Sequence, residues 1–128
     1  MESIIVAPTY LKELDNLHLQ NIWYNAYIDL NEASEIVFIG YSLPNADFEI
    51  KNLLKRAVGK SVELTVVLRK EDNPEYYKDI LRQEGVNEQD VESMIAKMHF
   101  PCQNYNSLFS TNDIRFYYEG LENYLKET

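Results

Sequence analysis

The sequence contains a single cysteine, Cys102, and only four glycines in 128 residues. One cysteine excludes an internal disulfide and any zinc site built from several cysteines, so a reducing cytoplasm is the simplest setting. The glycines stand at positions 40, 59, 85 and 120 and form no Gly-x-Gly pattern. The usual glycine-rich phosphate loop is therefore missing from this sequence.

Basic residues and long apolar runs are also scarce. The 12 Lys and Arg residues face 21 Asp and Glu residues, which gives a net charge of -9 and argues against general affinity for nucleic acid. No stretch approaches the roughly 20 apolar residues of a membrane span, and Met1-Glu2-Ser3 lacks the basic start of a signal peptide. We expect a cytoplasmic protein that contacts neither nucleic acid nor membrane.

What the sequence does contain is an alternation of strand and helix patterns within the length of one domain, residues 1–128. Such alternation predicts right-handed crossovers and an α/β fold with three layers, α/β/α. This is a Rossmann-like half with a mainly parallel sheet of about four strands. Strands are expected at 3–7, 35–39, 62–68 and 113–118, and helices within 11–33, at 46–58, from 74 to about 85, from 87 and at 121–125. Residues 99–112, which include Pro101 and many polar residues, are expected to form a loop or a short edge element.

The most informative segment is 35–58, a buried strand, a polar hinge and an amphipathic helix. Ile36–Ile39 is a short apolar run of the kind found in parallel strands. Gly40 ends it and would let a ligand approach the backbone. Pro44 and Asn45 predict a turn, with Asn45 as the helix N-cap. In open α/β folds, ligands bind at loops of this kind.

The motif Gly40-Tyr41-Ser42-Leu43-Pro44-x-x-Asp47 resembles the sirtuin-like family, especially its divergent bacterial branch. Three further stretches resemble flanking parts of the same domain: Ile4 to Lys12 with the Leu19-x-x-Ile22-Trp23 helix, Leu64 to Leu68, and Ile114 to Gly120. The resemblance covers most of the chain but only the C-terminal half of the family's NAD-binding domain.

The resemblance implies a site for NAD or ADP-ribose. Gly40 and Ser42 match the family's glycine and serine that line the adenosine side of the NAD pocket, and Tyr41 and Leu43 complete that loop. Asp47 would orient the loop or hold a ribose hydroxyl. Sirtuins have a ribose-contacting asparagine after the next strand; this chain has Leu68, Arg69 and Lys70 there, so Arg69 would meet a phosphate instead.

The family's catalytic histidine, phosphate loop and zinc-binding cysteines have no counterpart here, so the resemblance assigns no catalytic or metal-binding residue. Complete relatives cleave NAD as deacylases or hydrolases, often in defence against phage. This chain would be a fragment of such a protein or a remnant without the chemistry, inactive alone. In both cases an uncovered sheet edge predicts a homo-oligomer or contact with a missing N-terminal half.

Simpler interpretations stay open beside these. Gly40–Ser42 also suits a plain strand-to-helix turn, Asp47 an ordinary first-turn partner of the helix dipole, and Arg69 a solvated loop. The alternative function is a non-catalytic interaction or oligomerisation module that keeps only the fold.

Overall fold

A computed structural model describes residues 2–6, 20–44 and 46–127 of the chain. Four strands, β1 (Glu2–Val6), β2 (Ala33–Ile39), β3 (Glu63–Val67) and β4 (Ile114–Tyr117), form one sheet in the order β1-β2-β3-β4. Each neighbouring pair is parallel. The expected α/β fold with a parallel sheet of about four strands is confirmed.

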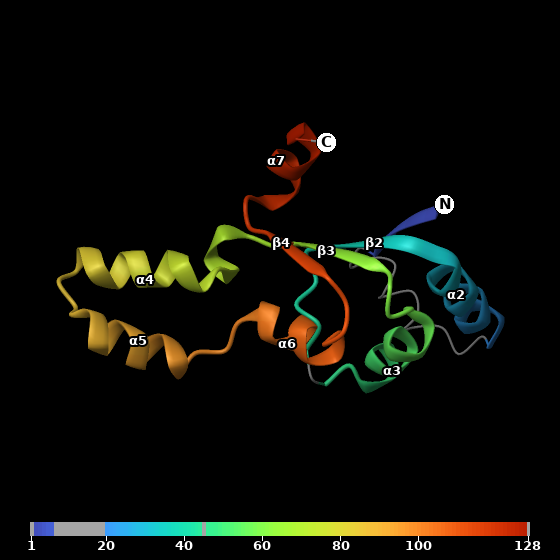
Figure 1. Cartoon of the computed structure of the whole chain (residues 1–128), viewed down its shortest axis with the longest axis horizontal. Coiled ribbons are helices and arrows are strands. Elements are labelled where there is room, and N and C mark those ends of the chain that lie inside the picture. The colour runs from blue at the N-terminus through green and yellow to red at the C-terminus, as the bar shows by residue number, and fades with distance from the viewer. Residues whose placement is uncertain (1, 7–19, 45, 128) are drawn as a thin grey trace.

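The helices lie on both sides of this sheet (Figure 1). Because every crossover steps in the same direction along the sheet, right-handed connections place the intervening helices on one face. That face carries α2 (Gln20–Glu32), α3 (Phe48–Ala57) and α6 (Pro101–Leu108). On the opposite face the described part of the chain has one helix, α7 (Gly120–Glu127).

The hydrophobic core lies between the sheet and the helices α2, α3 and α6. Side chains alternate along each strand, so Ile36 and Phe38 of β2 point to the same face. Both are fully buried, as are Leu30 of α2 and Leu54 of α3. Full burial of one such side chain contributes about 1.5–3 kcal/mol. Phe38 also contacts the ring of Tyr105 on α6 at 5.2 Å between centroids.

Two helices, α4 (Pro74–Gln83) and α5 (Glu88–Ala96), form a hairpin that extends away from the sheet beyond β4 (Figure 1). We call this hairpin the arm. Its helices begin at Asn73 and Asn87, whose side chains accept hydrogen bonds from the N–H groups of Glu75 and Asp90, at 3.1 and 2.9 Å. Both helix starts were expected from the sequence. Val91 is the one buried residue of the two helices.

Three sequence-based expectations are corrected. Residues 101–108 form helix α6, not a loop or edge element. The helix expected at 46–58 begins at Phe48, so Asp47 is its N-cap residue and does not lie in its first turn. Ala33 belongs to β2, which begins two residues earlier than expected. The predicted N-cap Asn45 and residues 7–19 of the first predicted helix lie outside the described residues.

Candidate functional site at the carboxyl ends of β2, β3 and β4

The carboxyl ends of three neighbouring strands form a continuous row, joined by backbone hydrogen bonds. The Gly40 N–H donates to the Val67 carbonyl at 2.9 Å, and the Leu68 N–H donates to the Tyr117 carbonyl at 2.8 Å. The Gly120 N–H in turn donates to the Leu68 carbonyl at 3.2 Å. The loops that follow β2, β3 and β4 therefore start side by side, at the edge where open α/β sheets bind ligands.

The loop after β2, residues 40–43, turns sharply through two left-handed positions. Gly40 has a φ of 64° and Leu43 a φ of 54°. The left-handed conformation costs a residue such as leucine on the order of 1–2 kcal/mol. The Leu43 side chain is fully buried in the core, which offsets this cost. Gly40 and Ser42 are exposed, so they form the outer surface of the loop while Leu43 anchors it.

Two side chains of helix α6 hold this loop by donating hydrogen bonds to its carbonyl groups. The Tyr105 hydroxyl donates to the Tyr41 carbonyl at 2.5 Å, and the Asn104 side-chain amide donates to the Ser42 carbonyl at 3.0 Å. Tyr105 is fully buried, and this burial, with the neighbouring Tyr41, raises the pKa of its hydroxyl. The hydroxyl therefore keeps its proton and acts as a hydrogen-bond donor.

Asp47 is tied to the same loop. Its carboxylate accepts a hydrogen bond of 2.5 Å from the Tyr41 hydroxyl, and it makes no side-chain cap to the α3 backbone. The structure thus brings five of the predicted site residues together, and Asp47 orients the loop through Tyr41.

Arg69 lies at the end of the next strand, over a separate shallow hollow. The hollow has a volume of about 310 Å³ and is lined by Arg69, Lys70, Glu71, Tyr118, Glu119, Gly120 and Asn123. The Arg69 side chain is 79% exposed, and its ion pair with Asp72 is long, at 3.8 Å. An exposed pair of this kind contributes little, so the guanidinium can turn to another anion. None of residues 40–43 lines this hollow, so the predicted site has two parts on one edge.

Tyr118 also lines the Arg69 hollow. Burial is the first cause that raises the pKa of its hydroxyl, followed by the neighbouring Cys102 thiol and the Asp72 carboxylate. The hydroxyl is therefore protonated at neutral pH, and it is hydrogen-bonded with the Cys102 thiol.

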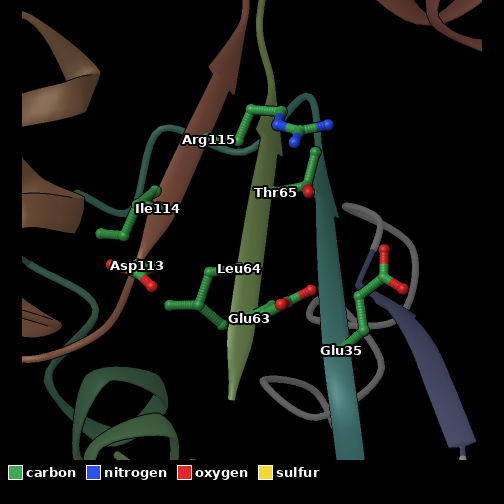
Figure 2. Close-up of a pocket in the computed structure, with 7 residues that line it drawn as sticks. All are labelled: Glu35, Glu63, Leu64, Thr65, Asp113, Ile114 and Arg115. Carbon is green, nitrogen blue, oxygen red and sulfur yellow. The ribbon is translucent and has the colours of Figure 1, made fainter. Parts of the chain in front are cut away.

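A second hollow, of about 380 Å³, lies at the opposite, amino ends of the strands (Figure 2). Glu35 and Glu63 are register partners on β2 and β3, and Asp113 precedes β4. Arg115 is the single basic residue among those that line it. Three carboxylates against one guanidinium disfavour a phosphate-bearing ligand. The predicted site residues all lie at the other, carboxyl edge, so we take that edge as the candidate functional site, although this hollow is larger.

The sequence-based prediction missed Asn104 and Tyr105, because it read their segment as a loop. The available signal was Pro101 followed by Gln103: proline favours the first helical position, and the Gln103 side chain accepts from the Phe100 N–H at 3.1 Å. Lys70, Gly120 and Asn123, which line the Arg69 hollow, were also not predicted.

Two features are absent from residues 2–6, 20–44 and 46–127. No helix there is both long enough and apolar enough to cross a bilayer. The same residues contain no group of three or more His, Cys, Asp or Glu side chains arranged to hold a metal ion.

No protein-family model, curated protein or solved structure matches this chain. The resemblance to sirtuin-like domains therefore depends on the sequence motif alone and stays a prediction.

Proposed function

We propose that this chain is the C-terminal half of a sirtuin-like domain that binds NAD or ADP-ribose, without catalytic activity of its own. The observation that carries the proposal is the row of strand ends, where Gly40, Arg69 and Gly120 follow β2, β3 and β4. In this proposal the exposed surface of Gly40 and Ser42 contacts the adenosine side of the ligand. Arg69 meets a phosphate.

The order of the strands supports a half-domain. The sheet grows in one direction, from β1 to β4, so the described strands include no point where the order reverses. Dinucleotides bind at such a reversal in doubly wound sheets. A second half would pair with the outer edge of β1 and supply the phosphate loop and the catalytic base, and complete proteins of this type cleave NAD.

Calorimetric titration with NAD and with ADP-ribose tests this proposal. We expect millimolar or tighter binding to the wild-type chain and loss of binding in Gly40→Val, because the added side chain occupies the ligand-facing surface. Gly85→Val is the matched control: Gly85 also has a left-handed φ, of 88°, but lies in the turn of the arm. Gly85→Val introduces the same kind of backbone strain and should bind NAD and ADP-ribose as the wild-type chain does. Absence of heat with both ligands would reject the proposal.

Arg69→Gln separates the phosphate contact from the adenosine contact. The substitution removes the charge and should weaken binding of ADP-ribose about tenfold, as expected for loss of one hydrogen bond to a charged group. Binding of adenosine, which lacks a phosphate, should not change. Equal weakening of both ligands would show that Arg69 acts only on the structure of the loop.

A second candidate function, an interaction or oligomerisation module, is favoured by exposed apolar side chains. Ile5 on the edge strand β1 is 59% exposed, and Met94 and Met98 at the end of the arm are 46% and 38% exposed. Edge strands and exposed apolar residues are common features of association surfaces. Under this interpretation the chain gives no heat with either nucleotide and self-associates.

A further inference from the structure

The loop 40–43 is held by two successive hydrogen bonds that start at His99, between α5 and α6. We call this pair of bonds the relay. His99 Nε2 lies 2.8 Å from Asn104 Oδ1, and Asn104 Nδ2 lies 3.0 Å from the Ser42 carbonyl oxygen. A carbonyl oxygen only accepts hydrogen bonds, so the amide nitrogen of Asn104 must face it. Asn104 Oδ1 then accepts from His99, which fixes both the amide orientation and the proton on Nε2.

This relay fixes the Ser42 carbonyl, and the Tyr105 hydroxyl fixes the peptide before it, so together they decide which backbone groups the loop presents outward. In a trans peptide the C=O and the following N–H point in opposite directions, and the described chain contains no cis peptide. Tyr105 draws the Tyr41 carbonyl toward α6, so the Ser42 N–H points away from α6. Asn104 draws the Ser42 carbonyl inward as well. Ser42 itself is exposed, and no hydrogen bond to its N–H exists within the described residues.

The chemical consequence concerns anions. An outward carbonyl would repel a phosphate oxygen, whereas an outward N–H and the Ser42 hydroxyl both donate to it. Asn104 is nine-tenths buried, with 8% of its surface exposed, and its amide nitrogen donates to the Ser42 carbonyl. Burial of an amide is costly unless its hydrogen bonds are made, so the pairing is strongly maintained.

We propose that Asn104 is a positioning residue of the loop 40–43: it keeps the Ser42 carbonyl turned inward, so that this carbonyl does not repel the phosphate attached to the ligand's adenosine, which would bind at the Ser42 N–H and hydroxyl. This inference rests on the proposed function and adds a residue and a ligand group to it. Asn104 does not touch the ligand and acts through Ser42.

The test compares two asparagines, Asn104 and Asn112, whose side-chain amides both donate to backbone carbonyls but at opposite ends of the strands. Asn112 Nδ2 donates to the Gly59 and Val62 carbonyls at 2.8 and 2.9 Å, before β3 at the amino ends of the strands. Both Asn104→Asp and Asn112→Asp remove the donor and place a carboxylate against carbonyl oxygens, so both should lower the melting temperature. Asn104→Asp alone should weaken ADP-ribose binding, by at least about tenfold, and should shift the Ser42 amide resonance in a ¹⁵N–¹H spectrum.

A second pair of variants avoids the core altogether. His99 is exposed, so His99→Ala should leave the fold intact while freeing the Asn104 amide. We expect ADP-ribose binding to weaken at least about twofold, and we expect His99→Gln, whose amide can again donate to Asn104, to restore it.

The outcomes separate the two proposals. If the wild-type chain binds ADP-ribose and both Asn104→Asp and His99→Ala bind it equally well, the positioning role is wrong and the proposed function stands. If Asn112→Asp weakens binding as much as Asn104→Asp, the effect is one of stability and the positioning role is again wrong. If the wild-type chain binds neither ADP-ribose nor NAD, the proposed function fails and the positioning role fails with it.

Discussion

Tyr105 combines three contacts that tie the loop 40–43 to the core. Its ring meets Phe38 of β2 and Phe116 of β4, at 5.2 and 6.3 Å between centroids. Its hydroxyl donates to the Tyr41 carbonyl. The ring contributes packing and the hydroxyl contributes loop geometry, so the two contributions can be separated by removing the hydroxyl alone.

Tyr105→Phe should destabilise the fold by about 1–3 kcal/mol, because it leaves the Tyr41 carbonyl without this donor while the ring contacts remain. Urea unfolding measures the change. Tyr76→Phe is the control, since the Tyr76 hydroxyl lies on the arm and has no hydrogen-bond partner among the described residues. A loss of stability in Tyr76→Phe equal to that in Tyr105→Phe would contradict the assignment.

The same hydroxyl predicts how stability depends on alkaline pH. Burial raises the pKa of Tyr105 above its ordinary value of 10.0. Above pH 10.0 the unfolded chain loses this proton while the folded chain keeps it, so stability is complete below that pH and falls as the pH rises. The slope for one such group is at most about 1.4 kcal/mol per pH unit. Unfolding of the wild type and of Tyr105→Phe at pH 8, 10 and 11 should show a smaller loss in the variant; identical slopes would refute the prediction.

Single residues differed in how far the sequence predicted them. The helix starts near residues 74 and 87 were correctly expected, because a helix start depends on neighbours a few positions away, and Asn73 and Asn87 cap them. Asp47 was expected to lie in the first turn of α3, but its carboxylate pairs with the Tyr41 hydroxyl and it stands before the helix. Leu43 takes a left-handed conformation, which the local sequence does not predict because leucine disfavours it. The burial of its side chain offsets the cost of that conformation.

The two helices of the arm contact each other more than they contact the sheet, and exposed ion pairs link them. Arg82 Nε lies 2.6 Å from Glu88, and Lys78 Nζ lies 3.3 and 3.4 Å from Glu75 and Glu92. The hydrogen bond and the charge of Arg82 lower the pKa of Glu88. These pairs are exposed and screened by salt, so each adds little to the stability of the arm. The caps and the few half-buried apolar residues must supply the rest, which makes the arm an element that can open locally.

Asn87→Ala should open α5 without unfolding the sheet. Loss of the bond from the Asp90 N–H removes an N-cap worth about 1 kcal/mol. Amide hydrogen exchange should become faster at residues 88–96 and should not change in β2 and β3. Ser93→Ala, in the exposed middle of the same helix, serves as the control. Faster exchange throughout the sheet would mean that the arm and the sheet unfold as one unit.

Helix α6 shows why part of the site escaped prediction. The helix is short, and its two buried residues, Asn104 and Tyr105, include one that is polar, so no apolar periodicity marks it. Its role depends on contacts with Tyr41 and Ser42, which lie 64 and 62 positions earlier in the chain. The strands were easier to predict, because their short β-branched and aromatic runs follow from burial in a parallel sheet.

The whole molecule is asymmetric about its sheet. Three helices cover one face, whereas α7 is the one described helix on the other, and β1 and β4 are the outer strands. The more open face is polar toward the amino ends of the strands, where Glu35, Glu63 and Arg115 lie. A polar face of this kind does not favour association with a second molecule through apolar contacts. The outer edge of β1 is the better candidate for association, and the exposed Ile5 of that strand lies on this same open face, next to the edge.

We expect the chain to self-associate through the outer edge of β1 at high protein concentration, with Ile5 at the contact. Ile5→Lys should shift the sedimentation profile toward the monomer, because an edge lysine would bring like charges together and would lose its hydration in a paired edge. Tyr24→Lys is the matched control: Tyr24 is 65% exposed but lies on helix α2 and not on the edge strand. A monomer at every concentration would contradict the prediction, and so would a Tyr24→Lys variant that dissociates while Ile5→Lys does not. The same edge is where a second half-domain would pair, so a peptide or protein that completes the sheet should compete with self-association.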